Sequence, residues 1–240
     1  GGFEARYGDK MSSVLDITYA RPQKAEASVQ ASLLGANIYA GLGNRKISLS
    51  QGLRYKTNQY MLGSLETKGE YSPSFLDYQA YLSWTPSEKW TFDLIGYISK
   101  NDYNFKPKDR ETNFGTLEDV KSFKVYFDGK EEDLFRTLYG TFKITRKWER
   151  KHALSLSASA FNTKERETYD IQGQYWLNET TSDKQLGVGT YMEHARNLLS
   201  SQTQTFKLTY DFRQGNHHMQ TGLSWRHESI SANSREWEYR

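Results

Sequence analysis

The stretch 75–99 constrains the fold of this chain more than any other. Its first half, FLDYQAYLSW, alternates apolar with polar residues, and its second half, WTFDLIGYIS, does the same after the turn TPSEK. A period of two is the signature of a strand with one apolar and one polar face. Two such strands joined by a short turn form an antiparallel hairpin, with Trp84 and Trp90 beside the turn on the apolar face. That face needs either a soluble core or lipid against it.

The same alternation recurs along the chain and predicts an all-β, up-and-down antiparallel protein. The predicted strands lie at about 25–34, 38–42, 47–56, 75–84, 90–99, 134–148, 154–160, 205–212 and 219–228, about nine in all. Gly35 predicts a tight turn between the first two, and Asp128-Gly129 predicts a hairpin turn. A further short strand is expected over 13–19, ending at Arg21-Pro22 because proline cannot donate to a ladder.

The connections between these strands are sorted by length. Short turns at 43–46, 86–88, 149–151 and 214–217 alternate with long connections at 61–74, 103–133 and 163–199, the turn at Gly35 being the exception. Outer-membrane barrels have short turns at one end and long loops at the other, whereas a soluble sandwich has no reason to sort its loops. The sequence therefore favours a transmembrane barrel over a soluble β protein. Because each strand reverses the chain, the long connections 103–133 and 163–199 are expected at the same end of the sheet, opposite the short turns. At that end we expect the strands to continue beyond the lipid and to pair with one another.

The composition excludes several classes of protein. Hydrophobic residues make up 36% of the chain and aromatic residues 15%, with no run of apolar residues long enough for a transmembrane helix. The absence of cysteine excludes disulfides and thiolate metal sites. A net charge of +3 with scattered Lys and Arg gives no indication of nucleic-acid binding. No GxSxG motif is present, so we expect no enzymatic activity, and no cofactor.

Residues 1–22, GGFEARYGDKMSSVLDITYARP, followed by an alternating strand, resemble the plug-to-barrel junction of TonB-dependent outer-membrane receptors. Further phrases carry the same resemblance: YKTNQYMLGSLETKGEY, RETNFGT, KVYFDGKE, AFNTKERETYDIQGQYWLNE, GVGTYMEHARN and REWEY. The resemblance implies that 1–22 is the end of a plug domain, with its last strand and a linker. Residues 23–240 would be the first part of a barrel of about 22 strands. Extracellular loops would lie near 61–74, 103–133 and 163–199, and most of the plug, with the TonB box, would precede this piece.

The function implied by this resemblance is energised uptake of a nutrient across the outer membrane of a Gram-negative bacterium. The nutrient would be a glycan, peptide, siderophore or similar compound. The implied partners are TonB, through the N-terminal part, outer-membrane lipid and a surface lipoprotein. The alternative is a barrel that does not transport, such as an adhesin-like binding protein.

Two groups of candidate site residues follow. Aromatic faces and one cation in the long connections are candidates for substrate binding, although packing within the loops would use them equally well: Tyr103, Phe105, Tyr175, Trp176, Tyr191 and Arg196. Charged residues expected to face the lumen, or to lie in the plug, are candidates for plug–barrel contacts: Arg54, Asp77 and Asp93 on the barrel, with Arg6, Asp9, Lys10 and Asp16 on the plug.

A metal site is not predicted. Asp128, Glu131, Glu132 and Asp133 offer the carboxylates that calcium prefers, but without the DxDxDG spacing of a calcium loop. A solvated surface hairpin is the expectation for this acidic run.

Overall fold

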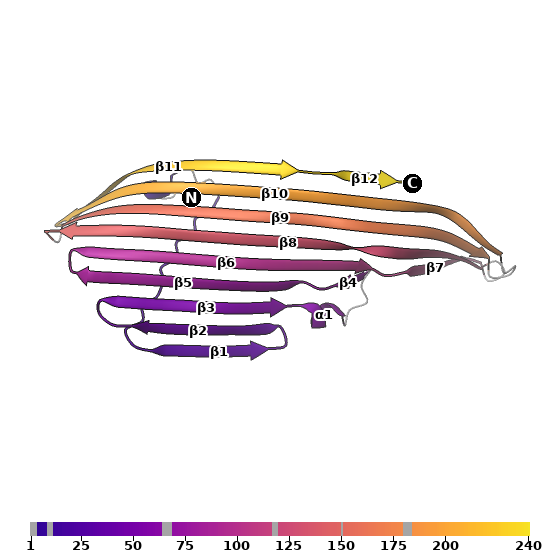
Figure 1. Cartoon of the computed structure of the whole chain (residues 1–240), viewed down its shortest axis with the longest axis horizontal. Helices are drawn as coiled ribbons and strands as arrows, with labels where there is room; N and C mark the ends of the chain where they lie inside the picture. Colours follow the sequence, from indigo (N-terminus) through magenta and orange to yellow (C-terminus); the bar gives the residue numbers. More distant parts are fainter. Residues whose placement is uncertain (1–3, 9–11, 64–68, 117–119, 150, 180–183) are drawn as a thin grey trace.

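The structure, a computed structural model, describes residues 4–8, 12–63, 69–116, 120–149, 151–179 and 184–240. They form one antiparallel sheet of twelve strands (Figure 1), which confirms the predicted all-β class. The strands are β1 (Glu26–Ser32), β2 (Gly35–Gly43), β3 (Ile47–Thr57), β4 (Gly69–Tyr71), β5 (Ser74–Ser87), β6 (Trp90–Pro107), β7 (Arg110–Gly115), β8 (Val120–Trp148), β9 (His152–Glu179), β10 (Lys184–Gln214), β11 (His217–Asn233) and β12 (Glu236–Tyr239). Two short helices, η1 (Ala5–Tyr7) and α1 (Gln59–Gly63), complete the described part.

Nine strands follow one another across the sheet in the order β1-β2-β3-β5-β6-β8-β9-β10-β11. They correspond to the nine predicted strands, each paired with its neighbour in sequence. The three others are side pairings: β4 on β6, β7 on β8 and β12 on β10. The sheet is open, because the edge strands β1 and β11 do not pair with one another in the described chain.

The short turns gather at one end of the sheet, as predicted. We call this the turn end; it holds the connections β2–β3, β5–β6, β8–β9 and β10–β11, on the left in Figure 1. The opposite, or loop, end is where β7 leads to β8 and β9 leads to β10. At Gly35 the backbone turns tightly into β2 with φ +135°, and a Cβ there would lie 2.1 Å from the Tyr55 carbonyl oxygen, so only glycine fits.

Two of the three segments predicted as long loops are strands over most of their length. The segment 103–133 holds the end of β6, all of β7 and the first half of β8, and 163–199 holds the far halves of β9 and β10. The loop prediction was wrong there because charged residues, which suggested loops, are tolerated at exposed positions of a strand. The expectation that strands continue and pair at this end is confirmed, since β9 pairs with β10 from 152 to 179. Segment 61–74 holds the end of α1 and strand β4.

The hairpin predicted at Asp128-Gly129 was also wrong, because both residues lie inside β8. The ladder from β6 to β8 ends near Pro107, which cannot donate, and resumes with β7 at Arg110. Between these two ladders the Asp109 carboxylate accepts a hydrogen bond of 2.8 Å from the Phe127 backbone N–H. Gly129 adopts φ +100° at this junction, so the turn signal marks an irregularity of the strand and not its end.

The two faces of the sheet differ in polarity. We call the face that contacts residues 19–22 the inner face, and the opposite one the outer face. The alternating apolar residues of the predicted strands lie on the outer face. They are cross-strand partners there, such as Leu82 with Leu94 and Leu156 with Leu208. Large outer-face residues are exposed, including Leu76, Tyr78, Leu94, Leu154, Leu156, Phe206, Leu208 and Leu223. In the described chain no second sheet covers them.

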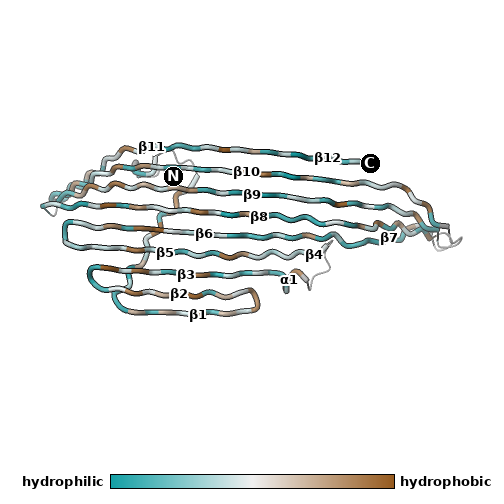
Figure 2. Tube along the Cα trace, viewed as in Figure 1, coloured by the Kyte–Doolittle hydropathy of each residue, from teal (hydrophilic) through white to brown (hydrophobic). Residues whose placement is uncertain are grey.

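The buried residues are mostly polar, the reverse of a soluble core. Six of them are small or charged residues of the inner face: Ser48, Ser50, Asp77, Ser83, Ser99 and Ser155. Figure 2 shows hydrophobic and hydrophilic positions in close alternation along the strands. None of the helices in the described residues is long and apolar enough to cross a membrane.

The N-terminal segment crosses the strands instead of running along one. In Figure 1 it passes behind the sheet as a thin trace, from the region of β11 toward β2. The short strand predicted at 13–19 was wrong: these residues join no ladder. A segment that crosses the strands cannot align its N–H and C=O groups with theirs, so side chains must hold it.

Candidate functional site

Five side chains fix the N-terminal segment to the inner face, and we call them the anchor. Arg21 donates from Nε to the Tyr81 hydroxyl at 3.0 Å and from Nη2 to Asp93 at 2.9 Å. Tyr81 in turn donates to the same carboxylate at 2.7 Å. The Tyr19 ring lies 5.0 Å from the Tyr81 ring, and Gln79 donates to the Tyr19 hydroxyl. The anchor thus joins the segment to β5 and β6 through residues about sixty positions away.

Of the residues predicted to make plug–barrel contacts, one lies in a described contact between the N-terminal segment and the sheet. Asp93 does contact the N-terminal segment, through Arg21. Arg54 instead pairs with Asp77 on the neighbouring strand, 2.6 Å between Nη2 and Oδ2, and Arg6 pairs with Glu4, with Asp16 at 3.9 Å. Asp9 and Lys10 lie outside the described residues.

No motif in the sequence pointed directly to Tyr19 or Arg21. Tyr19 fell in the segment predicted as a strand, and Arg21 was considered only as the residue before Pro22. Both residues lie just before the buried Pro22, in a stretch without the apolar alternation of the strands. That change of pattern is the one clue that could have marked them as contact residues.

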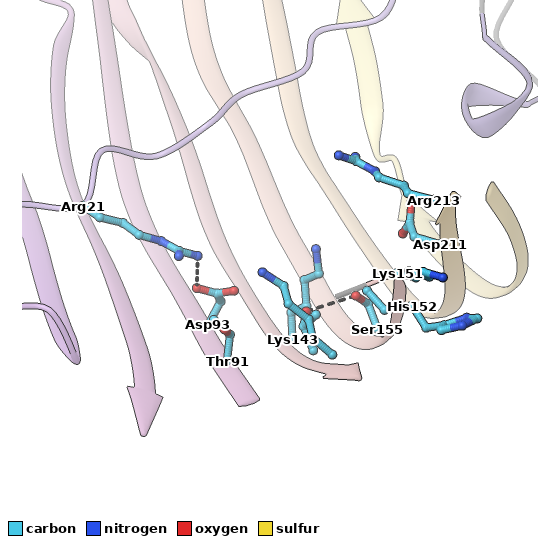
Figure 3. A pocket seen from close by; sticks show the side chains of 12 residues that line it. Arg21, Thr91, Asp93, Lys143, Lys151, His152, Ser155, Asp211 and Arg213 are labelled. Atoms are coloured by element: carbon cyan, nitrogen blue, oxygen red, sulfur yellow. Dashed lines mark hydrogen bonds and ion pairs between the residues drawn. The ribbon is translucent and has the colours of Figure 1, made fainter. Parts of the chain in front are cut away.

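A groove of about 450 Å³ lies beside the anchor on the inner face at the turn end. Its floor consists of small side chains from three adjacent strands, Thr91, Thr145, Ala153 and Ser155. Thr145 and Ser155 are cross-strand partners with 3.0 Å between their hydroxyl oxygens. Because these side chains are short, the long cations around them, Lys143, Lys147, Lys151 and Arg213, wall a hollow (Figure 3).

The predicted substrate-binding residues fall into four separate places. Tyr175 and Tyr191 are cross-strand neighbours on the inner face, with ring centroids 5.6 Å apart. Phe123 stacks on Tyr175 at 5.7 Å, and Phe127 meets Tyr191 edge-on at 6.5 Å. Burial of the ring raises the pKa of the Tyr191 hydroxyl. This aromatic row lies on the inner face near the loop end and extends over β8, β9 and β10.

The other four predicted residues do not join this row. Tyr103 and Phe105 lie on β6, with ring centroids 6.3 and 4.7 Å from that of Tyr71. Trp176 and Arg196 belong to the outer face. Arg196 donates to Asp170 and, at 3.1 Å, to the Tyr169 carbonyl oxygen.

Three carboxylates converge on the inner face of the same region. Oxygens of Glu131, Asp133 and Glu167 lie within 4.8 Å of one another. Burial raises the pKa of Glu131 and of Asp133, and the negative charge of Glu167 raises both further. Of the predicted acidic run, Glu132 points to the other face and pairs with Lys130, and Asp128 accepts from the Gly129 N–H at 2.8 Å. The strand alternation therefore divides the run instead of gathering it into one calcium loop.

Comparison with known proteins gave no relative: no family model matches the chain, and neither does any curated protein.

Proposed function

We propose that this chain is part of an outer-membrane β-barrel of the TonB-dependent receptor type, which takes up a nutrient across the outer membrane. The observation that carries the proposal is the inverted polarity of the sheet. Leu156 is 50% exposed and Leu223 75% exposed on the outer face, while serines and Asp77 are buried on the inner face. Exposed leucine in this number is costly in water and favourable in lipid.

An aromatic border on the outer face supports the same proposal. Near the turn end, Trp84 and Trp90 flank Phe92 with centroid distances of 5.2 and 6.1 Å, and Trp148 stacks on Tyr210 at 6.2 Å. Girdles of aromatic residues are found where the apolar band of a barrel meets the lipid headgroups. The first three residues lie on β5 and β6, and Trp148 and Tyr210 lie on β8 and β10, where His152 of β9 stacks on both.

The anchor supports a receptor-type barrel over an empty one. A segment held across the inner face by Arg21, Tyr19 and their partners is what a barrel with an internal domain requires. The aromatic row at the loop end offers flat apolar surfaces on the same inner face, suited to stacking a sugar ring or a peptide side chain. Strands beyond these 240 residues would complete the barrel.

The test uses the full-length protein in a Gram-negative host. Outer membranes should contain it, and cells should accumulate a labelled glycan, peptide, siderophore or cobalamin only when TonB is present. Accumulation in a TonB-deleted strain would contradict energised uptake. Binding of a ligand at the cell surface without any accumulation would favour the adhesin-like alternative, and absence from the outer membrane would overturn the membrane proposal itself.

A further inference from the structure

The groove beside the anchor holds an excess of positive charge. Lys143, Lys147, Lys151 and Arg213 line it, all four are exposed, and none forms an ion pair with any residue the structure describes. Unpaired cations at this density repel one another, and an anion between them would relieve that repulsion.

The carboxylates of the groove do not neutralise these cations, because both already have partners. Asp93 accepts hydrogen bonds from Arg21 and Tyr81. Asp211 accepts from Gln220 at 3.0 Å and lies 3.4 Å from His218 Nε2, on the side of β11. Figure 3 shows the ion pair of Asp93 with Arg21; Asp93 is also the cross-strand partner of Lys143, with which it forms no ion pair.

The cations surround the floor from several elements. Lys143 and Lys147 are four residues apart on β8, so they stand on the same face about 13 Å apart along the strand. Ala153 lies between Lys147 and Asp211 in the ladder, and Arg213 follows two residues later on β10. A ligand with a single charged group could contact only some of these cations, whereas a ligand with two or more charged groups could bridge them.

We propose that the groove binds a small soluble ligand that carries at least two oxyanion groups, phosphate or carboxylate. Arg213 supplies a planar fork of donors that fits such a group, and the lysines supply point charges. The Thr145 and Ser155 hydroxyls hydrogen-bond to each other, so one of the two keeps its proton free and adds a neutral donor at the floor. A lipid headgroup is the less suitable source of the same chemistry, because the groove opens on the inner face and the apolar band lies on the outer one.

The test is isothermal titration of the full-length protein, in uncharged detergent micelles at low salt, with pyrophosphate and with citrate. Saturable binding that weakens as salt rises is expected for at least one of them. Lys147→Gln and Arg213→Gln should each weaken it about tenfold, as expected for loss of one charge-assisted contact. Lys147→Arg should retain most of it. Lys46→Gln and Lys89→Gln, exposed lysines in other turns at the same end, should leave it unchanged.

Several results would overturn the proposal. One is no binding of either anion, and another is an equal loss in the Lys46 and Lys89 controls. Binding that requires phosphatidylglycerol in the micelles would assign the groove to a lipid headgroup. Binding of an oligoglutamate peptide without binding of either small anion would assign it to an acidic polypeptide. An unchanged circular dichroism spectrum separates each of these from misfolding, and none of them bears on whether the protein resides in the outer membrane.

Discussion

Strands β8, β9 and β10 have two halves of opposite polarity. In the half nearer the turn end, which we call the band, β9 presents Leu154, Leu156, Ala158 and Ala160 on the outer face. In the other half, which we call the extension (120–138, 162–179 and 184–202), the same face of β9 carries Asn162, Lys164, Arg166, Thr168 and Asp170. The ladder between β9 and β10 passes from one half to the other without a shift of register.

The inner face changes as well. It is lined by serine, threonine and lysine in the band, whereas in the extension Val125, Ile171, Tyr175 and Tyr191 lie on it together with the three converging carboxylates. Val125 and Ile171 are each 9% exposed, so the extension has a small apolar core of its own. The comparison teaches that the backbone sets only which residues share a face. The medium against each face, lipid or water, decides which polarity that face needs, and the proposed boundary lies near residue 161 of β9.

The largest expected effect separates ligand capture from barrel assembly. Replacing 172–192, a register-matched part of the β9–β10 extension, by an Asn-Gly turn should abolish binding of the nutrient that the uptake screen identifies. It removes Tyr175 and Tyr191 together, while the band keeps all its strand pairs. Binding to whole cells and the amount of protein in the outer membrane are the two measurements. A protein that assembles and binds at full affinity would exclude the aromatic row from ligand capture.

The second prediction compares leucines of the outer face in the two halves. Leu156 in the band and Leu198 in the extension are each 50% exposed. Leu156→Arg should cost about 2–4 kcal/mol of unfolding free energy in lipid, because a charge enters the apolar band, and Leu198→Arg about 0–1 kcal/mol. Ser157→Arg, on the inner face, should cost less than Leu156→Arg. Denaturant titration in lipid vesicles measures all three, and equal costs at 156 and 198 would remove the distinction between the halves.

The third prediction concerns the irregularity of β8 inside the extension. Gly129→Ala should cost about 1–3 kcal/mol, since φ is +100° and a Cβ would lie 1.8 Å from the Asp170 carbonyl oxygen. Gly140→Ala in the band is the matched control, because the nearest atom to its Cβ would be 3.8 Å away. The same denaturant titration applies. A neutral Gly129→Ala would show that β8 tolerates ordinary strand geometry at this point.

The smallest expected effect is a pH dependence with opposite signs on the two faces of the extension. The pKa of Glu131 is raised by burial and by neighbouring carboxylates, so the folded state holds its proton more tightly than the unfolded state. Its contribution to stability is therefore complete below about pH 4.5, the ordinary pKa of the group, and declines as pH rises through the raised value. The pKa of Glu132 is lowered by Lys130, so its contribution is lost as pH falls. Glu131→Gln and Glu132→Gln should change the slope of stability against pH in opposite directions, and slopes of the same sign would contradict this.

The sequence by itself determined the nine consecutive strands of the sheet, their faces and the sorting of turns to one end. The physical reason is that a period of two is a local property: the alternation at 75–99 specifies which side each residue takes whatever its partners are. It also indicated the tight turn at Gly35, because the positive φ that this turn requires is one that glycine adopts readily.

Only the tertiary structure decided where strands end and which residues meet. Charge suggested loops at 103–133 and 163–199, yet long neighbouring strands there satisfy one another's backbone groups, so the ladder continues to 179. Asp128-Gly129 is a turn signal in isolation and a junction between two ladders in the sheet. Arg21, Tyr19 and Tyr81 meet because a segment crosses strands about sixty residues distant, and that encounter depends on the register and curvature of the whole sheet.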